Sequence, residues 1–398
     1  MPKPIGGNNM KRTVLTAVAV LSLLTGQASA ADKVKLGLIT TLSGPQAVLG
    51  IPMRDAAELA LDMLGHKIGG LPAEIVYGDD QQKPDLGRQE ATKMLEKDKV
   101  DIITGMLSSA VLLAVYQEVI KSGTIIVSGN AGPHQVAGEM CSPYFFNVAF
   151  QSASEAQAMG LYLTAHHVDN VYAMAPNYAA GHDMIDGFKR GFKGKIVDEV
   201  YTALNQADYQ VEITQLRAAN PSAVFTFFPG SMGIQFIRQY AESGVKDKIP
   251  LYTTNTVDSN NLRSLQDAAV GIYDASYWGN NVDIPRSREF VAAFRKKYDY
   301  TPPYYAAGTF DAIFLIDSAV RAVGGNLADK KGLIRAMEKA DFPSVRGAFT
   351  FNTNHFPIED MYVFHVIKEN NNYDLKLDER VVKQQKDLYY TECHMKAD

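Results

Sequence analysis

The sequence predicts an α/β protein built from two open, doubly wound parallel sheets. Short runs of apolar, β-branched residues alternate along the chain with longer segments that have helical periodicity. The runs are apolar throughout, which is typical of parallel strands that are buried on both faces. The alternation occurs twice, before and after residues 146–151, where an extended segment without a helix interrupts it. Two α/β lobes joined by extended crossings are the simplest interpretation.

The strands and helices follow this rhythm in order. In the first lobe, strands are predicted at 34–41, 73–77, 100–104 and 124–128, and helices at 54–64, 86–95 and 112–120. In the second lobe, strands are predicted at 171–175, 196–201, 223–228 and 251–254, and helices at 154–165, 209–218 and 233–243. A further strand at 271–279 precedes helices at 287–297, 305–323 and 331–339. The chain then continues into "GAFTFN" and "MYVFHVIKEN", whose alternating polarity predicts hairpin strands.

The first 30 residues are predicted to be a cleaved secretory signal. The basic segment Met10-Lys11-Arg12 precedes an apolar run at 14–24, and the small residues 28–30 provide a cleavage site after Ala30. No cysteine lies at that position to carry a lipid, and no other run reaches the ~18 apolar residues of a membrane span. We therefore expect a soluble, periplasmic mature protein of the Gram-negative type.

The charge balance argues against nucleic-acid and anionic-membrane partners. The net charge of the full sequence is −5, and the signal removes three positive charges and no negative ones, which leaves −8. The mature chain has no basic block, so it lacks the electrostatic footprint that binds phosphate backbones or anionic lipids. Direct insertion into a membrane is not expected either.

The sequence contains two cysteines, Cys141 and Cys393. In an oxidising compartment a pair of cysteines usually forms a disulfide, which here would tie the end of the chain to its middle. Two separate buried thiols are the alternative. We expect the disulfide because of the compartment.

Small hydroxylated residues and glycines follow three strands of the first lobe. In open α/β sheets, ligands bind beyond the carboxyl ends of the strands. Two of these segments at the strand exits, that is, directly after the carboxyl end of a strand, lead into a helix, whose N-terminus favours an anion. Turns and helix caps would explain any single exit, but three at one sheet edge favour a small anionic ligand, most simply a carboxylate. The residues are Thr40, Thr41, Ser43 and Gly44, then Gly105, Ser108 and Ser109, and then Ser128, Gly129, Asn130, Ala131, Gly132 and Pro133.

The strand exits of the second lobe carry aromatic and amide side chains instead. Rings of this kind suit the apolar body of a small ligand. Taken singly, each ring is explained equally well as part of the core. The residues are Tyr178, Phe227, Phe228, Pro229, Asn255, Asp258, Tyr304 and Tyr305.

The sequence gives little support for an enzyme, because it shows none of the metal-binding or catalytic motifs considered below. The pair His166-His167 has no carboxylate partner at a metal-binding spacing, so a solvated helix end is the simpler interpretation. The sequence contains no G-x-S-x-G elbow and no P-loop lysine motif. No catalytic residue, metal or cofactor is nominated. A secreted α/β hydrolase that uses the same crevice stays open as the alternative from a different class.

The segments "TLSGPQAVLG", "GMLSSA", "SGNAGP", "PNYAAG" and "PPYYAAGTFDA" occur in this order along the mature chain. In this the sequence resembles the periplasmic solute-binding proteins of ABC transporters, in the branched-chain amino-acid receptor family. The resemblance covers the whole mature chain. It implies the type I periplasmic-binding fold, in which two lobes with three crossings close on a small solute, and a membrane permease as partner. We take the lobes as 31–147 plus 281–346, and 148–280 plus 347–398.

The resemblance also implies site residues. The solute carboxylate would meet a serine hydroxyl and backbone amides of the first lobe, and aromatic rings would come from the second lobe and from the region after its last strand. One side chain of the opening loop would face the solute. By motif match these residues are Ser109, then Asn130, Ala131 and Gly132, then Tyr178 and Tyr304, and finally Leu49.

One position departs from the amino-acid receptors. These place a carboxylate after the fifth strand of the second lobe to pair with the ligand's ammonium, and the matching position here is Asn255. A buried ammonium without a charged partner costs several kcal/mol. Asp258 would substitute only if the loop turned differently. The segments "ECHMKAD" and "MCSPYFF" resemble the subgroup that takes aromatic acids.

We therefore expect a binding protein for a small aromatic carboxylate of benzoate, hydroxybenzoate or cinnamate type. The alternative within the same family is a branched-chain or other amino acid.

Overall fold

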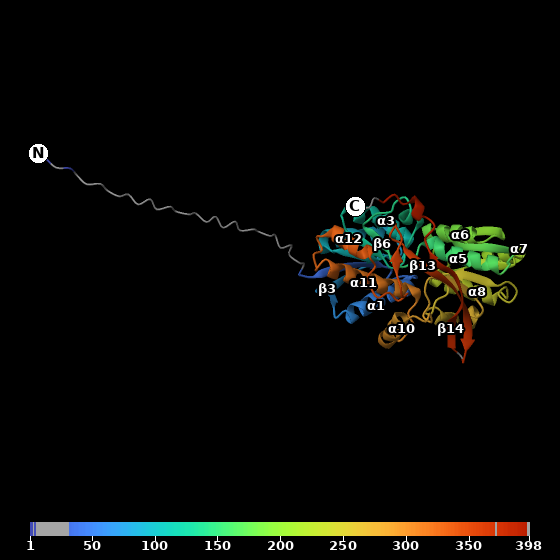
Figure 1. Ribbon diagram of the computed structural model, residues 1–398. Coiled ribbons are helices and arrows are strands. Elements are labelled where there is room, and N and C mark those ends of the chain that lie inside the picture. Colours follow the sequence, from blue (N-terminus) through green and yellow to red (C-terminus); the bar gives the residue numbers. More distant parts are fainter. Residues whose placement is uncertain (3, 5–31, 371, 396–398) are drawn as a thin grey trace.

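The structure is a computed structural model that describes residues 1, 2, 4, 32–370 and 372–395. The basic segment, apolar run and cleavage site of the predicted signal lie outside these residues. Figure 1 shows two α/β lobes side by side, with α1, α3, α11 and α12 around one sheet and α5 to α8 around the other. None of the helices in the described part of the chain is long and apolar enough to cross a membrane.

The first sheet contains six strands within the described residues, in the order β2-β3-β1-β4-β5-β6. All neighbours are parallel except the short β2, which pairs antiparallel with β3. Four helices follow its strands. The elements are β1 (Val34–Thr40), α1 (Ala47–Met63), β2 (Lys67–Ile68), β3 (Leu71–Asp79), α2 (Pro84–Lys93), β4 (Ile102–Gly105), α3 (Ser109–Lys121), β5 (Ile125–Ser128), α4 (His134–Ala137) and β6 (Phe145–Asn147). The strands β1, β4 and β5 are almost wholly buried, as their apolar sequences predicted.

The second sheet contains eight strands within the described residues, in the order β12-β13-β11-β10-β9-β7-β8, with β14 paired to β13. Its centre is parallel, and β12, β13 and β14 form an antiparallel edge. The elements are α5 (Ser152–Ala165), β7 (Asn170–Pro176), α6 (Ala179–Gly191), β8 (Lys195–Thr202), α7 (Gln210–Ala219), β9 (Ala223–Thr226), α8 (Ser231–Glu242), β10 (Leu251–Thr254), α9 (Leu262–Leu265), β11 (Tyr273–Ser276), β12 (Thr350–Phe351), β13 (Pro357–Glu369) and β14 (Asn372–Gln385).

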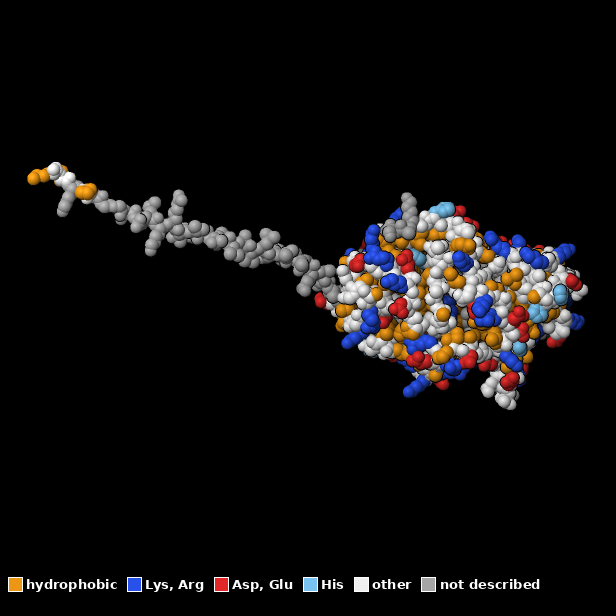
Figure 2. Space-filling view, in the orientation of Figure 1, with side chains coloured by type: hydrophobic (Ala, Val, Ile, Leu, Met, Phe, Trp, Pro, Cys, Tyr) orange, Lys and Arg blue, Asp and Glu red, His pale blue; other side chains and the backbone are white. Residues whose placement is uncertain are grey.

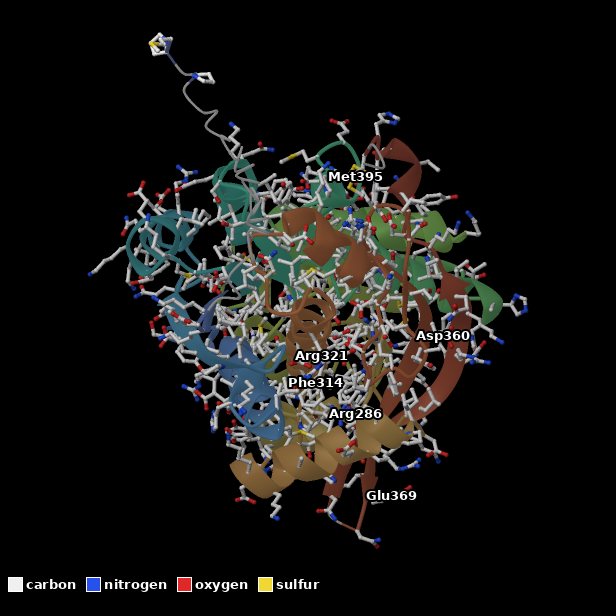
Figure 3. All side chains as sticks on the ribbon, turned by 60° about the vertical axis from the view of Figure 1, so that its left-hand side comes forward. Arg286, Phe314, Arg321, Asp360, Glu369 and Met395 are labelled. Carbon is white, nitrogen blue, oxygen red and sulfur yellow. A yellow bond between two sulfur atoms is a disulfide. The ribbon has the colours of Figure 1, made fainter. Side chains whose placement is uncertain are left out.

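The chain crosses between the lobes three times before its C-terminal tail returns to the first lobe. It leaves the first sheet after β6, returns after β11 to the helices α10 (Pro285–Tyr298), α11 (Tyr304–Ala322) and α12 (Lys330–Glu338), and re-enters the second sheet at β12. Helices α10 and α11 pack against α1. At the start of α10, the guanidinium of Arg286 lies 4.5 Å from the ring centre of Phe314 on α11 (Figure 3). The predicted fold class is confirmed, while the predicted residue bounds of the lobes stay a prediction.

The main secondary-structure element absent from the sequence prediction is α6. Its sequence is rich in glycine, which disfavours a helix, but the glycines allow α6 to approach α5 closely. A Cβ on Gly187 would lie 2.1 Å from the carbonyl oxygen of Ala153, and one on Gly191 would lie 2.2 Å from that of Gln157. Close packing between the helices therefore outweighs local propensity.

The predicted disulfide between Cys141 and Cys393 is confirmed, with 5.6 Å between the Cα atoms. It holds the C-terminal tail against the first sheet. Tyr389, just before the 3-10 turn Tyr390–Glu392, is buried in the same apolar cluster as Tyr116 and Phe145. Figure 2 shows positive and negative side chains interspersed over the visible face, without a large block of either sign.

Candidate ligand-binding cleft

A cavity of about 410 Å³ lies where strand ends of the two lobes face each other. It is built from the segments that follow β4 and β5 in the first lobe and β7, β9 and β10 in the second. This is where ligands bind in open α/β sheets. The lining residues are Leu49, Gln82, Leu107, Ser108, Ser109, Asn130, Ala131, Phe150, Ser152, Tyr178, Ala180, Met184, Phe227, Pro229, Asn255 and Tyr305. They include eight of the twelve residues predicted for a ligand, namely Leu49, Ser108, Ser109, Asn130, Ala131, Tyr178, Pro229 and Asn255.

The first-lobe wall of the cavity is the N-terminus of α3. Ser108 occupies the N-cap position, yet its hydroxyl makes no capping bond and has no hydrogen-bond partner although it is buried. Ser109 is the first residue of the helix and is 3% exposed. The positive end of the helix dipole and an unpaired hydroxyl therefore meet at the cavity, which is an arrangement suited to a carboxylate.

The backbone after β5 was expected to offer amide N–H groups to the solute carboxylate, and the structure differs from this expectation. The N–H of Ala131 donates to the carbonyl of Met106 at 2.8 Å, so it is not free for a solute. Gly132 is not among the lining residues, and its carbonyl accepts from the N–H and the hydroxyl of Ser152. The side chain of Asn130 faces the cavity instead, with Nδ2 donating to the carbonyl of Leu107 at 2.7 Å.

Ser43, on the opening loop, lies away from the cavity. Its hydroxyl donates to Asp79 Oδ2 at 2.5 Å, and its N–H donates to Oδ1 of the same carboxylate. The residue is exposed. Its hydroxyl therefore ties the opening loop to the end of β3 and is not available to a ligand in the cavity.

The second-lobe wall is aromatic. Tyr178 begins the turn into α6, and its ring is stacked on that of Phe227, with 6.3 Å between the ring centres. The predicted Phe228 points the other way because successive residues of an extended segment face opposite sides. Its ring is buried against Tyr209 and Phe236 in the core. Phe227 therefore takes the place predicted for Phe228.

A similar one-residue shift occurs at the start of α11. Tyr305 lines the cavity, whereas Tyr304 lies behind it, with 4.0 Å between the two ring centres. The hydroxyl of Tyr304 donates to the carbonyl oxygen of Asn255 at 3.4 Å. Burial raises the pKa of both phenols well above its usual value.

Asn255 is held by a carboxylate that the sequence analysis missed. Its Nδ2 donates to Oε2 of Glu155 at 2.6 Å, and Oε1 of Glu155 accepts from the N–H of Tyr277 at 2.9 Å. Glu155 lies on α5 and is fully buried, and desolvation raises its pKa to about 8. A carboxyl group does therefore stand behind the amide, but burial keeps it largely neutral at pH 7. A single Glu in a helix of small residues gave no signal of this role.

Asp258 does not take the place of Asn255 in the cavity. Its Oδ1 accepts from the backbone N–H groups of Asn260 and Asn261, and the residue lines a neighbouring cavity of about 300 Å³. Burial raises its pKa to about 6 and that of nearby Asp274 to about 7. Three buried acids thus lie around the end of β10, and none of them lines the solute cavity.

Side chains at the rim join the two lobes. Gln46, just before α1, donates to Asn205 Oδ1 at 2.9 Å and to the hydroxyl of Ser231 at 3.1 Å. At another part of the rim, His134 of α4 contacts Asp183 of α6 twice, through Nδ1 at 2.5 Å and through its backbone N–H at 2.9 Å. These contacts hold the lobes in a closed arrangement over the cavity.

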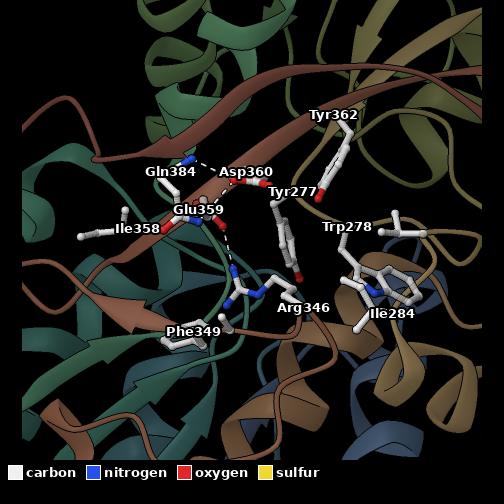
Figure 4. A pocket seen from close by; sticks show the side chains of 12 residues that line it. Tyr277, Trp278, Ile284, Arg346, Phe349, Ile358, Glu359, Asp360, Tyr362 and Gln384 are labelled. Carbon is white, nitrogen blue, oxygen red and sulfur yellow. Dashed lines mark hydrogen bonds and ion pairs between the residues drawn. The ribbon is translucent and has the colours of Figure 1, made fainter.

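A second cavity, of about 440 Å³, lies at the crossings and is centred on Arg346 (Figure 4). Its guanidinium donates to the carbonyls of Val148 and Ala149 on the first crossing and to Glu359 Oε2, at 2.7 Å for the last. Asp311 lies 3.8 Å from its Nε. The charges around this cavity therefore pair with one another.

Among the described residues, no group of three or more His, Cys, Asp or Glu side chains could hold a metal ion. His166 Nδ1 contacts the carbonyl of Tyr162 at 2.8 Å, and His167 is the residue after it at the end of α5. Both lie at a helix end, outside the cleft.

Comparison with known proteins places this chain among binding proteins. A family model described as "Periplasmic binding protein" matches residues 33–371. Leu/Ile/Val-binding protein homolog 6 of Brucella melitensis is 25% identical over 373 residues, which cover 91% of this chain and 94% of that protein. The solved structure of an ABC-transporter solute-binding protein from R. palustris, in complex with benzoate, has a TM-score of 0.86 at 27% identity and covers 91% and 99% of the two chains. Another from Rhodopseudomonas palustris BisB5, in complex with 3,4-dihydroxy benzoic acid, has a TM-score of 0.83 at 28% identity and covers 89% and 99%.

Proposed function

The chain belongs to the periplasmic binding protein family, and on that premise we propose that it captures a small aromatic carboxylate for an ABC uptake transporter. The observation that carries this proposal is the cavity itself. One wall offers the N-terminus of α3 with Ser108 and Ser109, and the other offers aromatic rings.

The carboxylate would lie against α3. The unpaired hydroxyl of Ser108 supplies a donor, and the first N–H groups of the helix have no partner within the helix. Hydrogen bonds to a charged group contribute about 1.5–3 kcal/mol each. The mature chain has a net negative charge, so this local positive end is what would favour an anion in the cleft.

The aromatic body would lie between rings of both lobes. Phe150 comes from the first crossing, Tyr178 and Phe227 from the second lobe, and Tyr305 from α11. Aromatic pairs contribute roughly 0.5–1.5 kcal/mol each beyond the area they bury. In support, two relatives of more than 25% identity were solved with benzoate-type acids bound.

A branched-chain amino acid is the second candidate, because a curated relative is named as a Leu/Ile/Val-binding protein homolog. The cavity argues against it. The position that would face the ammonium is the amide of Asn255, and Glu155 behind that amide is largely neutral at pH 7 because burial raises its pKa to about 8. An ammonium would thus lose its hydration without gaining a full opposite charge.

Calorimetric titration of the purified mature protein tests this proposal. We expect benzoate, a hydroxybenzoate or cinnamate to bind more tightly than leucine, isoleucine or valine. Tighter binding of leucine than of all the aromatic acids would contradict it. Recovery of the bound acid unchanged, by mass spectrometry, is expected of a binding protein, whereas a product would indicate a hydrolase.

The cellular context follows from the same proposal. We propose export through a signal cleaved after Ala30 and delivery of the solute to a membrane permease. N-terminal sequencing of protein from the periplasmic fraction is expected to begin at Ala31. Uptake of the labelled acid should be lost when the gene is deleted and restored by the intact gene. Retention of an uncleaved chain in the cytoplasm would contradict the localisation.

A further inference from the structure

The turn that follows β3 has a strained backbone. Its two central residues, Gln81 and Gln82, both have positive φ angles, 48° and 58°, and the N–H of Lys83 donates to the carbonyl of Asp80 at 2.7 Å. These are the features of a type I′ turn, whose central positions are usually occupied by glycine, asparagine or aspartate because other side chains are strained there. Two consecutive glutamines therefore lower the stability of the fold at this place.

Two carboxylates hold the turn in this conformation. Oδ1 of Asp79 accepts from the N–H of Gln81 at 3.1 Å. Oδ1 of Asp80 accepts from the N–H of Gln82 at 2.7 Å, and it also accepts from the hydroxyl of Thr41, which follows β1, at 2.5 Å. Asp80 is fully buried. The backbone of Gln82 is therefore fixed by the ends of β1 and β3 and not by its own side chain.

The side chain of Gln82 carries a second cost besides its backbone. Gln82 is 8% exposed and lines the solute cavity. Its side chain makes no hydrogen bond to any residue in the described part of the chain, and its buried amide oxygen has no partner. Buried polar groups in native proteins are nearly always paired. Backbone strain together with an unpaired buried amide is typical of a residue that is held for a ligand.

The turn lies beside the α3 wall of the cavity. Gly87, in the first turns of α2, has no side chain, and a Cβ there would lie 2.4 Å from Cγ1 of Val111 in the first turn of α3 and 3.7 Å from Cβ of Asp80. Gln82 and the unpaired hydroxyl of Ser108 therefore reach the cavity from the same lobe. The amide of Gln82 can turn Nε2 toward an anion, because no hydrogen bond of its side chain within the described residues fixes its orientation.

We propose, on the basis of the function proposed above, that Gln82 is a second side-chain donor to the solute carboxylate, through Nε2, alongside Ser108. A carboxylate needs several donors when it leaves water, and the residues that line the cavity include no lysine, arginine or histidine. Gln82 supplies a donor without adding a charge. The strained turn gives up stability to place this amide at the carboxylate.

Size-matched variants of Gln82 test the donor. Benzoate, 4-hydroxybenzoate and cinnamate are each titrated by calorimetry at neutral pH, in parallel with their primary amides, which carry no negative charge. Gln82→Met removes the donor, so the acids should bind roughly ten- to a hundredfold more weakly and the amides should lose less than about tenfold. Gln82→Glu places a negative charge beside the carboxylate. It should lower the ratio of acid affinity to amide affinity further than Gln82→Met does.

Gln81 provides a matched control, because it also has a positive φ in the same turn but its side chain is exposed. Gln82→Gly and Gln81→Gly should each keep or raise the midpoint of urea denaturation of the solute-free protein, since glycine adopts a positive φ without strain. Only Gln82→Gly should weaken binding of the acids. Gln81→Met should keep the wild-type ratio of acid to amide affinity.

The outcomes separate the two proposals. If the acids bind the wild type but Gln82→Met and Gln82→Glu keep the wild-type ratio, the inference about Gln82 is wrong and the aromatic-acid function stands. If Gln82→Gly lowers affinity and stability together, Gln82 has only a structural role. If Gln82→Met does not fold, the ratio in Gln82→Glu and the pair of glycine variants decide. If no aromatic acid binds the wild type, both proposals are wrong.

Discussion

Two cavities of this protein, the cleft with about 410 Å³ and the crossings cavity with about 440 Å³, differ in the pairing of their polar groups. Around the crossings, Arg346 bonds to two backbone carbonyls and to Glu359, and Asp360 accepts from Arg380 and Gln384. In the cleft, four buried polar atoms have no hydrogen-bond partner, against one, Nε of Arg346, at the crossings. Cavity size does not distinguish a binding site from a structural junction here, whereas the pairing of its polar groups does.

The largest expected effect is on the crossings cavity. Arg346→Met removes the only cation within reach of Glu359 among the described ion pairs and leaves two buried acids, Glu359 and Asp311, without it. Breaking a buried ion pair costs about 3–5 kcal/mol of unfolding free energy, which urea denaturation measures. The control Arg380→Met removes an exposed pair with Asp360 and should cost less than about 1 kcal/mol. Equal losses in the two variants would contradict the buried pairing of Arg346 with Glu359.

The second prediction concerns Glu155, which belongs to neither cavity wall but supports the cleft. Burial raises its pKa in the folded protein to about 8, above an unfolded value of about 4.3. Its protonated form therefore stabilises the fold below pH 4.3, and this contribution is lost as pH rises through 8. The loss approaches about 1.4 kcal/mol per pH unit at most.

Glu155→Gln should flatten the fall in unfolding free energy between pH 5 and 8. Burial also raises the pKa values of Asp258 and Asp274, so a part of the fall in unfolding free energy remains in the variant. Urea denaturation at a series of pH values measures the slope. An unchanged slope would show that Glu155 is ionised in the folded protein, against the expectation from its burial.

A smaller effect is expected at the carboxylate end of the cleft. Ser108→Ala should weaken binding of the aromatic acid by about 1.5–3 kcal/mol, roughly ten- to a hundredfold, with little change in stability because the hydroxyl has no partner in the protein. Ser122→Ala, at the other end of α3, removes a hydroxyl that donates to the carbonyl of Val119 and contacts the hydroxyl of Thr124. It should lower stability without changing affinity. The opposite pattern would move the site away from α3.

The smallest effect is expected at the rim. Asp183 raises the pKa of His134, with Glu392 and Asp186 adding to the shift. The ion pair between His134 and Asp183, which we call the latch, is complete below an ordinary histidine pKa of about 6.5. It is lost as the pH rises through the raised pKa of His134. Solute affinity should therefore fall less than about tenfold over that range, measured by calorimetry. His134→Gln should remove this dependence, and the exposed His66→Gln should retain it. The same pH profile in both variants would exclude the latch.

The sheets could be predicted because their central strands are apolar on both faces, a signal that needs no tertiary information. Helix α6 could not, because its glycines favour a helix only once α5 lies against them. In the cleft, the strand-exit rule led to Ser108, Asn130 and Asn255. It led to both rings of the pairs Phe227-Phe228 and Tyr304-Tyr305. Phe228 and Tyr304 were the ones expected at the ligand, whereas Phe227 and Tyr305 line the cavity, since one residue of register decides which ring faces it. Glu155 acts from a helix that the strand-exit rule does not consider.

The disulfide between Cys141 and Cys393 spans 252 residues of sequence, and that interval contains the whole second sheet. Its two cysteines lie on the first lobe and at the end of the chain. If the protein were pulled from residue 32 and from its C-terminal tail, the force would pass through the disulfide. The chain between Cys141 and Cys393 would then bear no tension. Only the first-lobe elements from β1 to α4 would extend. Roughly 800–900 Å of contour length would stay hidden until reduction, so the second lobe, with half of the cleft, is shielded from mechanical load.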